Sequence, residues 1–243
     1  MNWLIILPLA ALAGFIQAFT GFGAAAILMT VLPYAFSMLQ APAITQIICT
    51  FLAATMAWHF RKSINLKLML WPTIIYTAAS LVVVPLTKSF DLHILTIVFG
   101  GFLVALSLYS ITLDKKLKVS GSAGALIGCS ALSGVLGGLF GVGGPTMALY
   151  LFAVSENREE YLGTLQLLFV ISNLAVTVSR IANGIITADI LPTCAVGAAG
   201  ILAGKHLGYK VGDKLDADKM RFAVNLCVGL SGVFTILQQT VLR

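Results

Sequence analysis

Long apolar stretches separated by short polar loops make up most of this chain. They cover residues 4–36, 41–60, 68–87, 92–113, 121–154, 161–182, 188–204 and 220–241. One helical crossing of a bilayer needs about 20 apolar residues. Six of the stretches are close to that length, so each of these six predicts a single transmembrane helix.

The other two stretches are too long for one crossing and too short for two. Residues 4–36 and 121–154 number 33 and 34, whereas two full crossings need about 40. Each contains a glycine cluster near its middle, Thr20-Gly21-Phe22-Gly23 in one and Phe140-Gly141-Val142-Gly143-Gly144-Pro145 in the other. Glycine and proline disfavour a helix interior, although proline suits the first turn of a new helix. We expect two short helices in each stretch, meeting at a glycine turn.

The two halves of the chain match at a constant offset of 120 residues. The matching pairs are Gly14 with Gly134, Gly21 with Gly141, Gly23 with Gly143, Gln46 with Gln166, and Pro72 with Pro192. These matches predict an internal repeat, with units at residues 1–118 and 119–243. Each unit contains one glycine-tipped hairpin, at 4–36 or 121–154, followed by three transmembrane helices.

The positive charges distinguish two topologies for the broken stretches. These stretches either cross the membrane as kinked helices or enter and return as re-entrant hairpins, and Lys and Arg concentrate on the cytoplasmic side. Crossing divides the Lys and Arg residues eight to seven, whereas hairpins leave twelve on one side and only Lys88, Arg180 and Arg243 on the other. The hairpin topology is favoured. It places both termini outside and inverts the second repeat relative to the first, as in secondary transporters.

Composition agrees with an all-α polytopic membrane protein. Of the 243 residues, 59% are hydrophobic and 10% charged, against about 25% charged in soluble domains. The net charge of +6 lies in short loops, which excludes a nucleic-acid-binding surface. The four cysteines match no metal or redox spacing and are expected to pack in the core. The start of the chain lacks the basic region of a signal peptide, so we expect it to form the first membrane helix.

The glycine tips carry the candidate chemistry. A helix that begins at each tip, near Gly23 and near Pro145, presents backbone N–H groups without intrahelical acceptors and a partial positive charge. Glycine lets an anion approach the backbone closely. All nine acidic residues lie at the ends of apolar stretches or in loops, so no carboxylate competes for a cation. The pattern predicts a small-anion site near the midplane, with no cofactor and no metal.

Polar side chains near the tips could complete this site, and Gln46 and Gln166 are favoured because the repeat relates them. Gln17, Thr50 and Ser172 are further hydrogen-bonding candidates. Packing of glycines and interhelical hydrogen bonds are the alternative explanation, and Arg180 could either attract anions or snorkel to the interface. The predicted substrate-binding residues are Thr20, Gly21, Phe22, Gly23, Ala24, Gln46, Gly141, Gly143, Gly144, Pro145, Gln166, Asn173 and Arg180.

The segments Thr20-Gly21-Phe22-Gly23-Ala24 and Gly138 to Pro145 resemble the paired glycine signatures of the TauE/SafE sulfite exporter family, which includes 4-toluene sulfonate uptake permeases. The resemblance covers nearly the whole chain. It implies a secondary transporter for small anions such as sulfite or sulfoacetate in the bacterial cytoplasmic membrane. Many members have a glycine triplet where this chain continues with Ala24, Ala25 and Ala26. Their methyl groups would crowd a bulky sulfonate.

Three functions are compatible with these observations to different degrees. A secondary transporter would bind a small anion between the tips and expose it alternately to each side. A passive anion channel could use the same tips with an open path. An intramembrane enzyme would need paired carboxylates, a metal motif or an activated nucleophile, and none is visible. No nucleotide-binding P-loop motif is present. The partners expected are the anion and the lipid bilayer, and the many small residues would permit a homodimer.

Overall fold

The structure is a computed structural model that describes residues 3–112, 121–211 and 217–240. Its regular elements within these ranges are all helices, which confirms the predicted all-α class. Five of the described helical segments are long and apolar enough to cross a membrane: Gln40–His59, Leu66–Ser89, Ala123–Phe140, Arg158–Ala182 and Ala188–Lys210. The chain therefore has the helices of a polytopic membrane protein.

The helices follow the apolar stretches closely. The first half contains α1 (Trp3–Thr20), α2 (Ala24–Met29), α3 (Gln40–His59), α4 (Leu66–Leu86) and α5 (Leu92–Thr112). The second half contains α6 (Ala123–Phe140), α7 (Gly144–Val154), α8 (Arg158–Ala182), α9 (Leu191–Val211) and α10 (Ala217–Thr240). Short 3₁₀ turns lie at Leu32–Tyr34 (η1), Arg61–Ser63 (η2), Thr87–Ser89 (η3) and Ala188–Ile190 (η4). α9 differs in that it continues past the apolar stretch 188–204 and includes Lys205 and Lys210.

Both long stretches break at their glycine clusters. Gly21, Gly23 and Gly141 have φ angles of 80°, 105° and 70°, a left-handed region that favours glycine. Only the second helix of each pair is short, at 6 residues in α2 and 11 in α7. The first helices, α1 and α6, have 18 residues each, or about 27 Å. The expectation of two short helices was therefore wrong for these first helices, since nothing before the glycines ends them.

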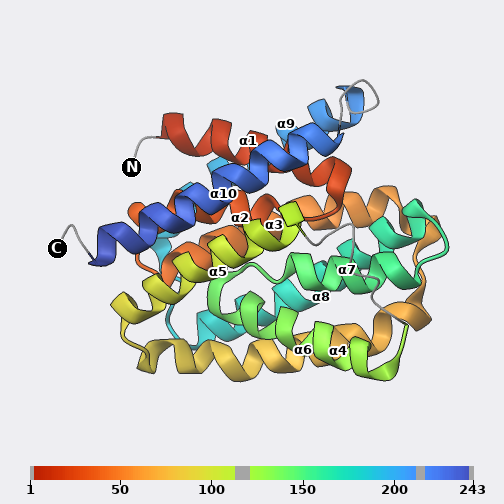
Figure 1. The fold of residues 1–243 in the computed structure, drawn as a ribbon, viewed down its shortest axis with the longest axis horizontal. Helices are drawn as coiled ribbons and strands as arrows, with labels where there is room; N and C mark the ends of the chain where they lie inside the picture. The colour runs from red at the N-terminus through yellow and green to blue at the C-terminus, as the bar shows by residue number, and fades with distance from the viewer. Residues whose placement is uncertain (1–2, 113–120, 212–216, 241–243) are drawn as a thin grey trace.

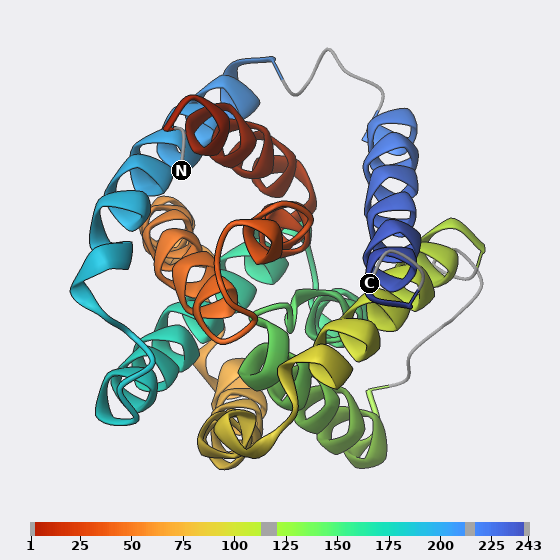
Figure 2. The ribbon, with the colours of Figure 1, turned by 90° about the vertical axis from the view of Figure 1, so that its left-hand side faces the viewer.

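Helix pairs from the two halves pack along each other. α1 packs against α9 and α4 against α6, α3 packs against both α8 and α9, and α4 also packs against α8. α5 packs against α10, a pair that stands at one side of the bundle (Figure 2). If each helix is replaced by the helix at the same place in the other half, so that α1 becomes α6, α3 becomes α8 and α4 becomes α9, the same set of packed pairs results. Glycines allow the close approach, since a Cβ on Gly204 would collide with the Ala11 carbonyl and one on Gly134 with the Tyr76 carbonyl.

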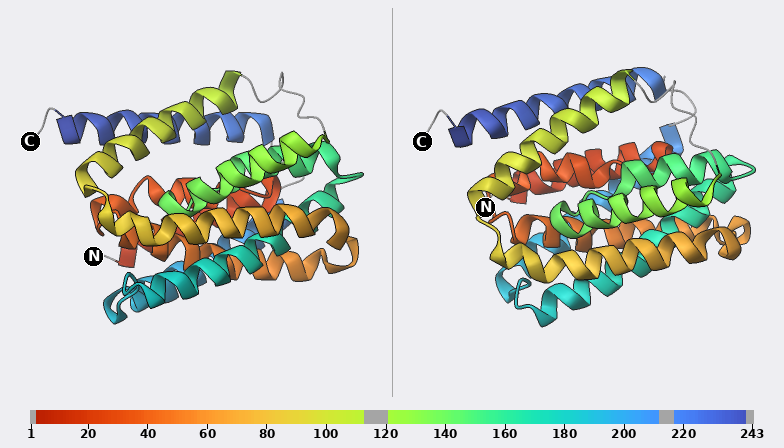
Figure 3. Two further views of the ribbon diagram at one scale, coloured as in Figure 1. Left: turned by 90° about the horizontal axis from the view of Figure 1, so that it is seen from below. Right: turned by 60° about the horizontal axis from the view of Figure 1, so that its bottom comes forward.

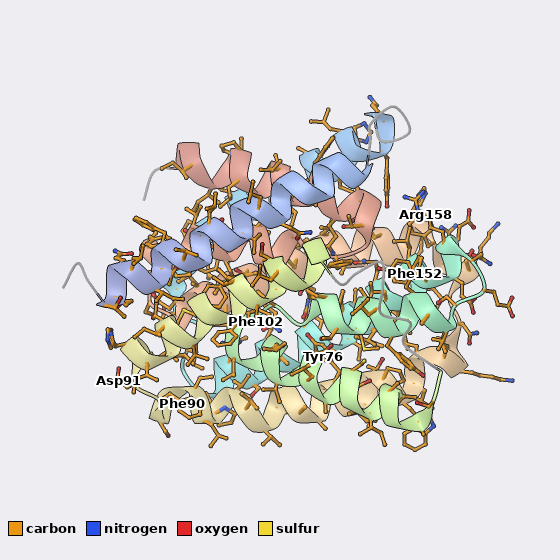
Figure 4. All side chains as sticks on the ribbon, in the orientation of Figure 1. Tyr76, Phe90, Asp91, Phe102, Phe152 and Arg158 are labelled. Atoms are coloured by element: carbon orange, nitrogen blue, oxygen red, sulfur yellow. The ribbon has the colours of Figure 1, made fainter. Side chains whose placement is uncertain are left out.

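The long helices run roughly along one axis of the molecule, so the bundle has two ends (Figures 1 and 3). Phe90 and Asp91 lie at one end, and Phe152 and Arg158 at the other (Figure 4). We call these the Asp91 end and the Arg158 end. The start of α1 and the end of α10 both lie at the Asp91 end (Figure 1).

Hydrogen bonds assign the loops that follow the two tips to opposite ends. After the first tip, the Tyr34 hydroxyl lies 2.7 Å from the Thr235 hydroxyl near the end of α10. Gln40 Nε2 donates to Thr187 Oγ1, in the loop after α8, over 3.2 Å. Both contacts lie at the Asp91 end, whereas Arg158, which follows the second tip and opens α8, lies at the opposite end.

The Arg158 end is held by contacts between the α3–α4 loop and the start of α8. Asn65 Nδ2 donates to Glu160 Oε1 over 2.7 Å, and Ser63 Oγ donates to Glu159 Oε2 over 3.1 Å. Asn65 also caps α4 by accepting from the Leu68 N–H, as an N-cap asparagine does. These bonds join the first half to the second at this end.

Candidate functional site

One cavity lies between the two glycine tips. Its empty volume, counting the part open to solvent, is ≈ 430 Å³. The helices α3, α4 and α8 contribute side chains from the middle of their lengths, and Figure 4 shows Tyr76 of α4 away from both ends. The lining residues are Gln17, Phe22, Gly23, Ala25, Ala26, Cys49, Tyr76, Gly141, Val142, Gly143, Gly144, Pro145, Phe169 and Asn173.

Two glutamine side chains brace the first tip. Gln166 Nε2 donates to the Gly21 carbonyl, and Gln166 Oε1 accepts from Gln17 Nε2 over 3.2 Å. Gln17 Oε1 in turn accepts from the Ala24 N–H over 3.2 Å. One of the N–H groups at the start of α2 is thereby occupied, while the N–H of Ala25 has no acceptor in the described part of the chain.

Thr20 also bonds within the first tip. Its hydroxyl lies within bonding distance of the carbonyls of Ile16 and Phe22, at 3.0 Å and 2.5 Å. Its own carbonyl accepts from the Tyr161 hydroxyl over 3.0 Å. Thr20 therefore holds the shape of the tip from behind, because it is not among the lining residues.

The second tip has no side-chain brace of this kind. Among the described residues, the backbone N–H groups of Gly143 and Thr146 have no acceptor. These N–H groups begin α7, whose 11 residues give a longer row of aligned peptide dipoles than the first tip has. Gly143 is closely packed, since a Cβ there would collide with the Ser133 carbonyl and the Tyr76 hydroxyl. Gly144 faces the cavity, where a Cβ would lie 3.2 Å from Phe22 Cβ and 3.8 Å from Phe169 Cζ.

A buried chain of polar side chains leads to the cavity from α8. Arg180, 1% exposed, donates through Nε to Gln46 Oε1 over 3.2 Å and through Nη2 to the Gly138 carbonyl over 2.7 Å. Gln46 Nε2 donates to Asn173 Oδ1 over 3.3 Å. Asn173, 8% exposed, lines the cavity. The chain thus connects a buried cation to the cavity wall.

The glycine tips fall within a region that matches a known protein family. The family model described as sulfite exporter TauE/SafE matches residues 6–235, which include both tips. The chain belongs to the TauE/SafE family. The prediction from the paired glycine signatures is confirmed.

A curated relative of this TauE/SafE protein is a probable membrane transporter protein of Methanocaldococcus jannaschii, with 28% identity over 158 residues. The match spans 60% of this chain and 59% of that protein's own length. No solved structure matches the TauE/SafE chain. The family description refers to sulfite export, and the relative's name to membrane transport.

The cavity gathers about half of the residues that the sequence predicted for substrate binding. The predicted residues that line it are Phe22, Gly23, Gly141, Gly143, Gly144, Pro145 and Asn173. Those that do not line it are Thr20, Gly21, Ala24, Gln46, Gln166 and Arg180. These six lie behind the wall and take part in the hydrogen bonds described above. Arg180 does not snorkel, because it is enclosed by the protein.

Sequence reasoning missed several wall residues of the TauE/SafE cavity. Tyr76 and Phe169 form an aromatic wall with ring centroids 6.3 Å apart, and Cys49, interpreted as a packing residue, also faces the space. Nothing in an apolar helix distinguishes such residues from lipid-facing ones. Thr50 and Ser172 bond elsewhere, to the Gln46 carbonyl and to Thr77. No group of residues that could hold a metal occurs in the described ranges.

Proposed function

We propose that this TauE/SafE protein is a secondary transporter that binds a small anion in the cavity between its glycine tips. The single observation that carries the proposal is that two tips 120 residues apart in sequence line one cavity. Backbone N–H groups at a helix N-terminus attract anions, and Asn173 adds an amide in the same wall. The cavity lies near the middle of the helices, where a transporter binds its substrate.

The proposed substrate is a small sulfur oxyanion, sulfite or an organosulfonate such as sulfoacetate. The family description names sulfite, and the limited volume of the cavity favours a small ligand. Phe22, Phe169 and Tyr76 give part of the wall an apolar surface, which would accept the carbon group of an organosulfonate. The oxygens would face the second tip and Asn173.

The proposed mechanism is alternating access by two inverted repeats, at residues 1–118 and 119–243. The exchange of helix pairs between the halves supports a two-fold relation. The loops after the two tips lie at opposite ends of the bundle, as re-entrant hairpins of opposite orientation require. In this mechanism the two repeats rock about the cavity and open it to one side at a time.

The proposed orientation places the Arg158 end in the cytoplasm of a bacterial cell and the protein in its inner membrane. Arg61 and Lys62 of η2, with Lys67 at the start of α4, share this end with Arg158, because Ser63 and Asn65 bond the start of α8. Positive residues favour the cytoplasmic side. Both chain termini would then face outward.

Counterflow in proteoliposomes tests this function. Vesicles loaded with unlabelled sulfite and diluted into a trace of ³⁵S-sulfite should accumulate label transiently, because a carrier exchanges bound substrate across the membrane. Vesicles loaded with chloride, and vesicles without protein, are the controls. Uptake of label that never exceeds equilibration would indicate a channel, and no protein-dependent uptake of sulfite or sulfoacetate would contradict the proposed substrate class.

A further inference from the structure

Arg180 is a buried cation that has no carboxylate partner among the residues the structure describes. Its hydrogen bonds go to the neutral Gln46 side chain and to the Gly138 carbonyl, and no acidic group of the described residues lies within ion-pair distance of it. Burying an unpaired charge in a membrane protein is costly. A residue kept there at this cost needs a role that a neutral side chain would not fill.

Arg180 fixes the direction of both side-chain hydrogen bonds that lead from it through Gln46 to Asn173. A guanidinium can only donate, so the Gln46 atom facing Arg180 is the acceptor Oε1. The other amide atom of Gln46 is therefore the donor Nε2, and the Asn173 atom that it meets is the acceptor Oδ1. The orientation of both amides follows from the charge of one residue.

This order leaves a donor at the cavity wall. With Oδ1 of Asn173 occupied by Gln46, the Nδ2 group is the part of the amide that remains for a ligand. Asn173 is 8% exposed, so more than nine-tenths of it is buried, and it lines the cavity together with the rings of Phe22, Tyr76 and Phe169. A fixed Nδ2 donor suits an oxyanion, whereas a rotated amide would present an acceptor and repel it.

We propose that Arg180 is a positioning residue that acts through Gln46 to hold Asn173 with its donor toward the bound anion. The inference rests on the proposed function and adds the source of its anion specificity. Arg180 does not touch the substrate. It lies seven residues beyond Asn173 on α8, about two helical turns away.

The alternative is a purely structural role, because Arg180 also ties α8 to the Gly138 carbonyl of α6. Ser80 offers a matched control, since its hydroxyl makes a comparable buried bond to the Gly134 carbonyl of α6 over 2.7 Å. Ser80→Ala removes an interhelical bond of the same kind without touching the chain from Arg180 to Asn173. The two roles therefore predict different effects on binding.

A double-mutant cycle on detergent-purified full-length protein, with sulfite as the probe in calorimetry, separates them. Gln46→Met removes both hydrogen bonds of the relay and should weaken sulfite binding about tenfold or more, as expected for a donor to a charged group. Asn173→Ala should have a similar effect. If Gln46 acts through Asn173, adding Gln46→Met to Asn173→Ala should change the Kd less than twofold.

Further variants at Gln46 and Arg180 test the direction of these hydrogen bonds. Gln46→Glu retains an acceptor for Arg180 but cannot donate to Asn173 when ionised, so the asparagine would turn its donor inward and sulfite binding should be lost in a folded protein. Arg180→Lys keeps a donor and should retain more sulfite affinity than Arg180→Met. Ser80→Ala should leave the Kd within twofold of wild type. Size-exclusion profiles and melting temperatures report folding.

The outcomes distinguish failure of this inference from failure of the proposed function. Additive effects of the Gln46 and Asn173 changes, or full sulfite affinity in Gln46→Glu, would overturn the positioning role while leaving the anion site in place. A wild-type protein that binds neither sulfite nor sulfoacetate would overturn the anion site and, with it, the role of Arg180.

Discussion

The two glycine tips share a Gly-x-Gly pattern and a left-handed first glycine, Gly21 or Gly141, but their surroundings differ. At the first tip, Gln166 and Gln17 occupy the Gly21 carbonyl and the Ala24 N–H. At the second tip, the N–H groups of Gly143 and Thr146 have no acceptor within the described residues, and Asn173 lines the same cavity. The first tip is thus bonded by two glutamine side chains, and we propose that the anion binds nearer to the second tip.

The glutamines Gln46 and Gln166, 120 residues apart in sequence, show how the surroundings of the tips differ. Gln166 donates to the first tip itself, whereas Gln46 accepts a hydrogen bond from Arg180 and donates one to Asn173. The residue 120 positions before Arg180 is Phe60, which carries no charge. The two halves therefore differ in chemistry at these positions.

The membrane topology of the loops after the two tips should give the largest difference, because each loop is either accessible from outside the cell or not. Single cysteines at Ser37 and Ser155, in a protein without its four native cysteines, report the loops after the two tips. The opposite ends of the bundle predict that a membrane-impermeant maleimide added to whole cells labels Ser37→Cys and spares Ser155→Cys. Labelling of both or of neither would contradict re-entrant hairpins of opposite orientation.

Filling the cavity at the second tip should have the next largest effect. Gly144 has an ordinary backbone conformation and faces Phe22 and Phe169, so Gly144→Leu should abolish measurable sulfite binding in a folded protein. Gly143 is less suitable, because a side chain there would collide with backbone. The control is Gly128→Leu on α6, where a Cβ meets nothing within 4 Å. Calorimetry that finds equal sulfite affinity in both variants would remove the second tip from the site.

Removing one amide side chain near each tip should have different effects. We expect the change near the second tip to lower sulfite affinity and the change near the first tip to lower stability. Asn173→Leu should lower sulfite affinity by about 1.5–3 kcal/mol, because it removes a donor to a charged ligand. Gln17→Leu should lower the free energy of unfolding by about 1–3 kcal/mol by leaving the Ala24 N–H and Gln166 Oε1 without partners. The measurements are calorimetry and denaturant titration. A larger loss of affinity in Gln17→Leu than in Asn173→Leu would reverse the assignment.

Removing one tyrosine hydroxyl near each tip should give the smallest effects on sulfite binding and stability. The Tyr76 hydroxyl lies against Gly143 at the cavity, whereas the Tyr161 hydroxyl bonds the Thr20 carbonyl. Tyr76→Phe should weaken sulfite binding by about 0.5–1.5 kcal/mol, and Tyr161→Phe should reduce stability by a similar amount with little change in Kd. An unchanged Kd in Tyr76→Phe would make that residue a packing group only.

Local sequence signals predicted the helices and their breaks because these depend on neighbouring residues. Runs of apolar residues give a helix in lipid, and Gly21 and Gly141 adopt left-handed conformations directly after α1 and α6, as Gly23 does directly before α2. The lengths of α1 and α6 were not predicted, because the midpoint of a long apolar stretch does not reveal how deep its tip reaches.

The cavity wall was only partly predictable because it depends on which helix faces meet. The tips themselves carried a signal, but Tyr76, Phe169 and Cys49 lie on apolar helices where every face looks alike in sequence. Arg180 near the end of an apolar stretch resembled an interfacial arginine. Its burial follows from tertiary packing against α3 and α6, which no local pattern encodes.

A structure of the protein determined at saturating sulfite would show directly whether the anion binds between the tips. We expect one sulfite in the cavity, with oxygens within hydrogen-bond distance of a backbone N–H of Gly143 or Gly144 and of Asn173 Nδ2. The Gln17–Gln166 bond at the first tip should remain intact. Sulfite bound only at the first tip with that bond broken, or density for the anion only outside the cavity, would contradict this expectation.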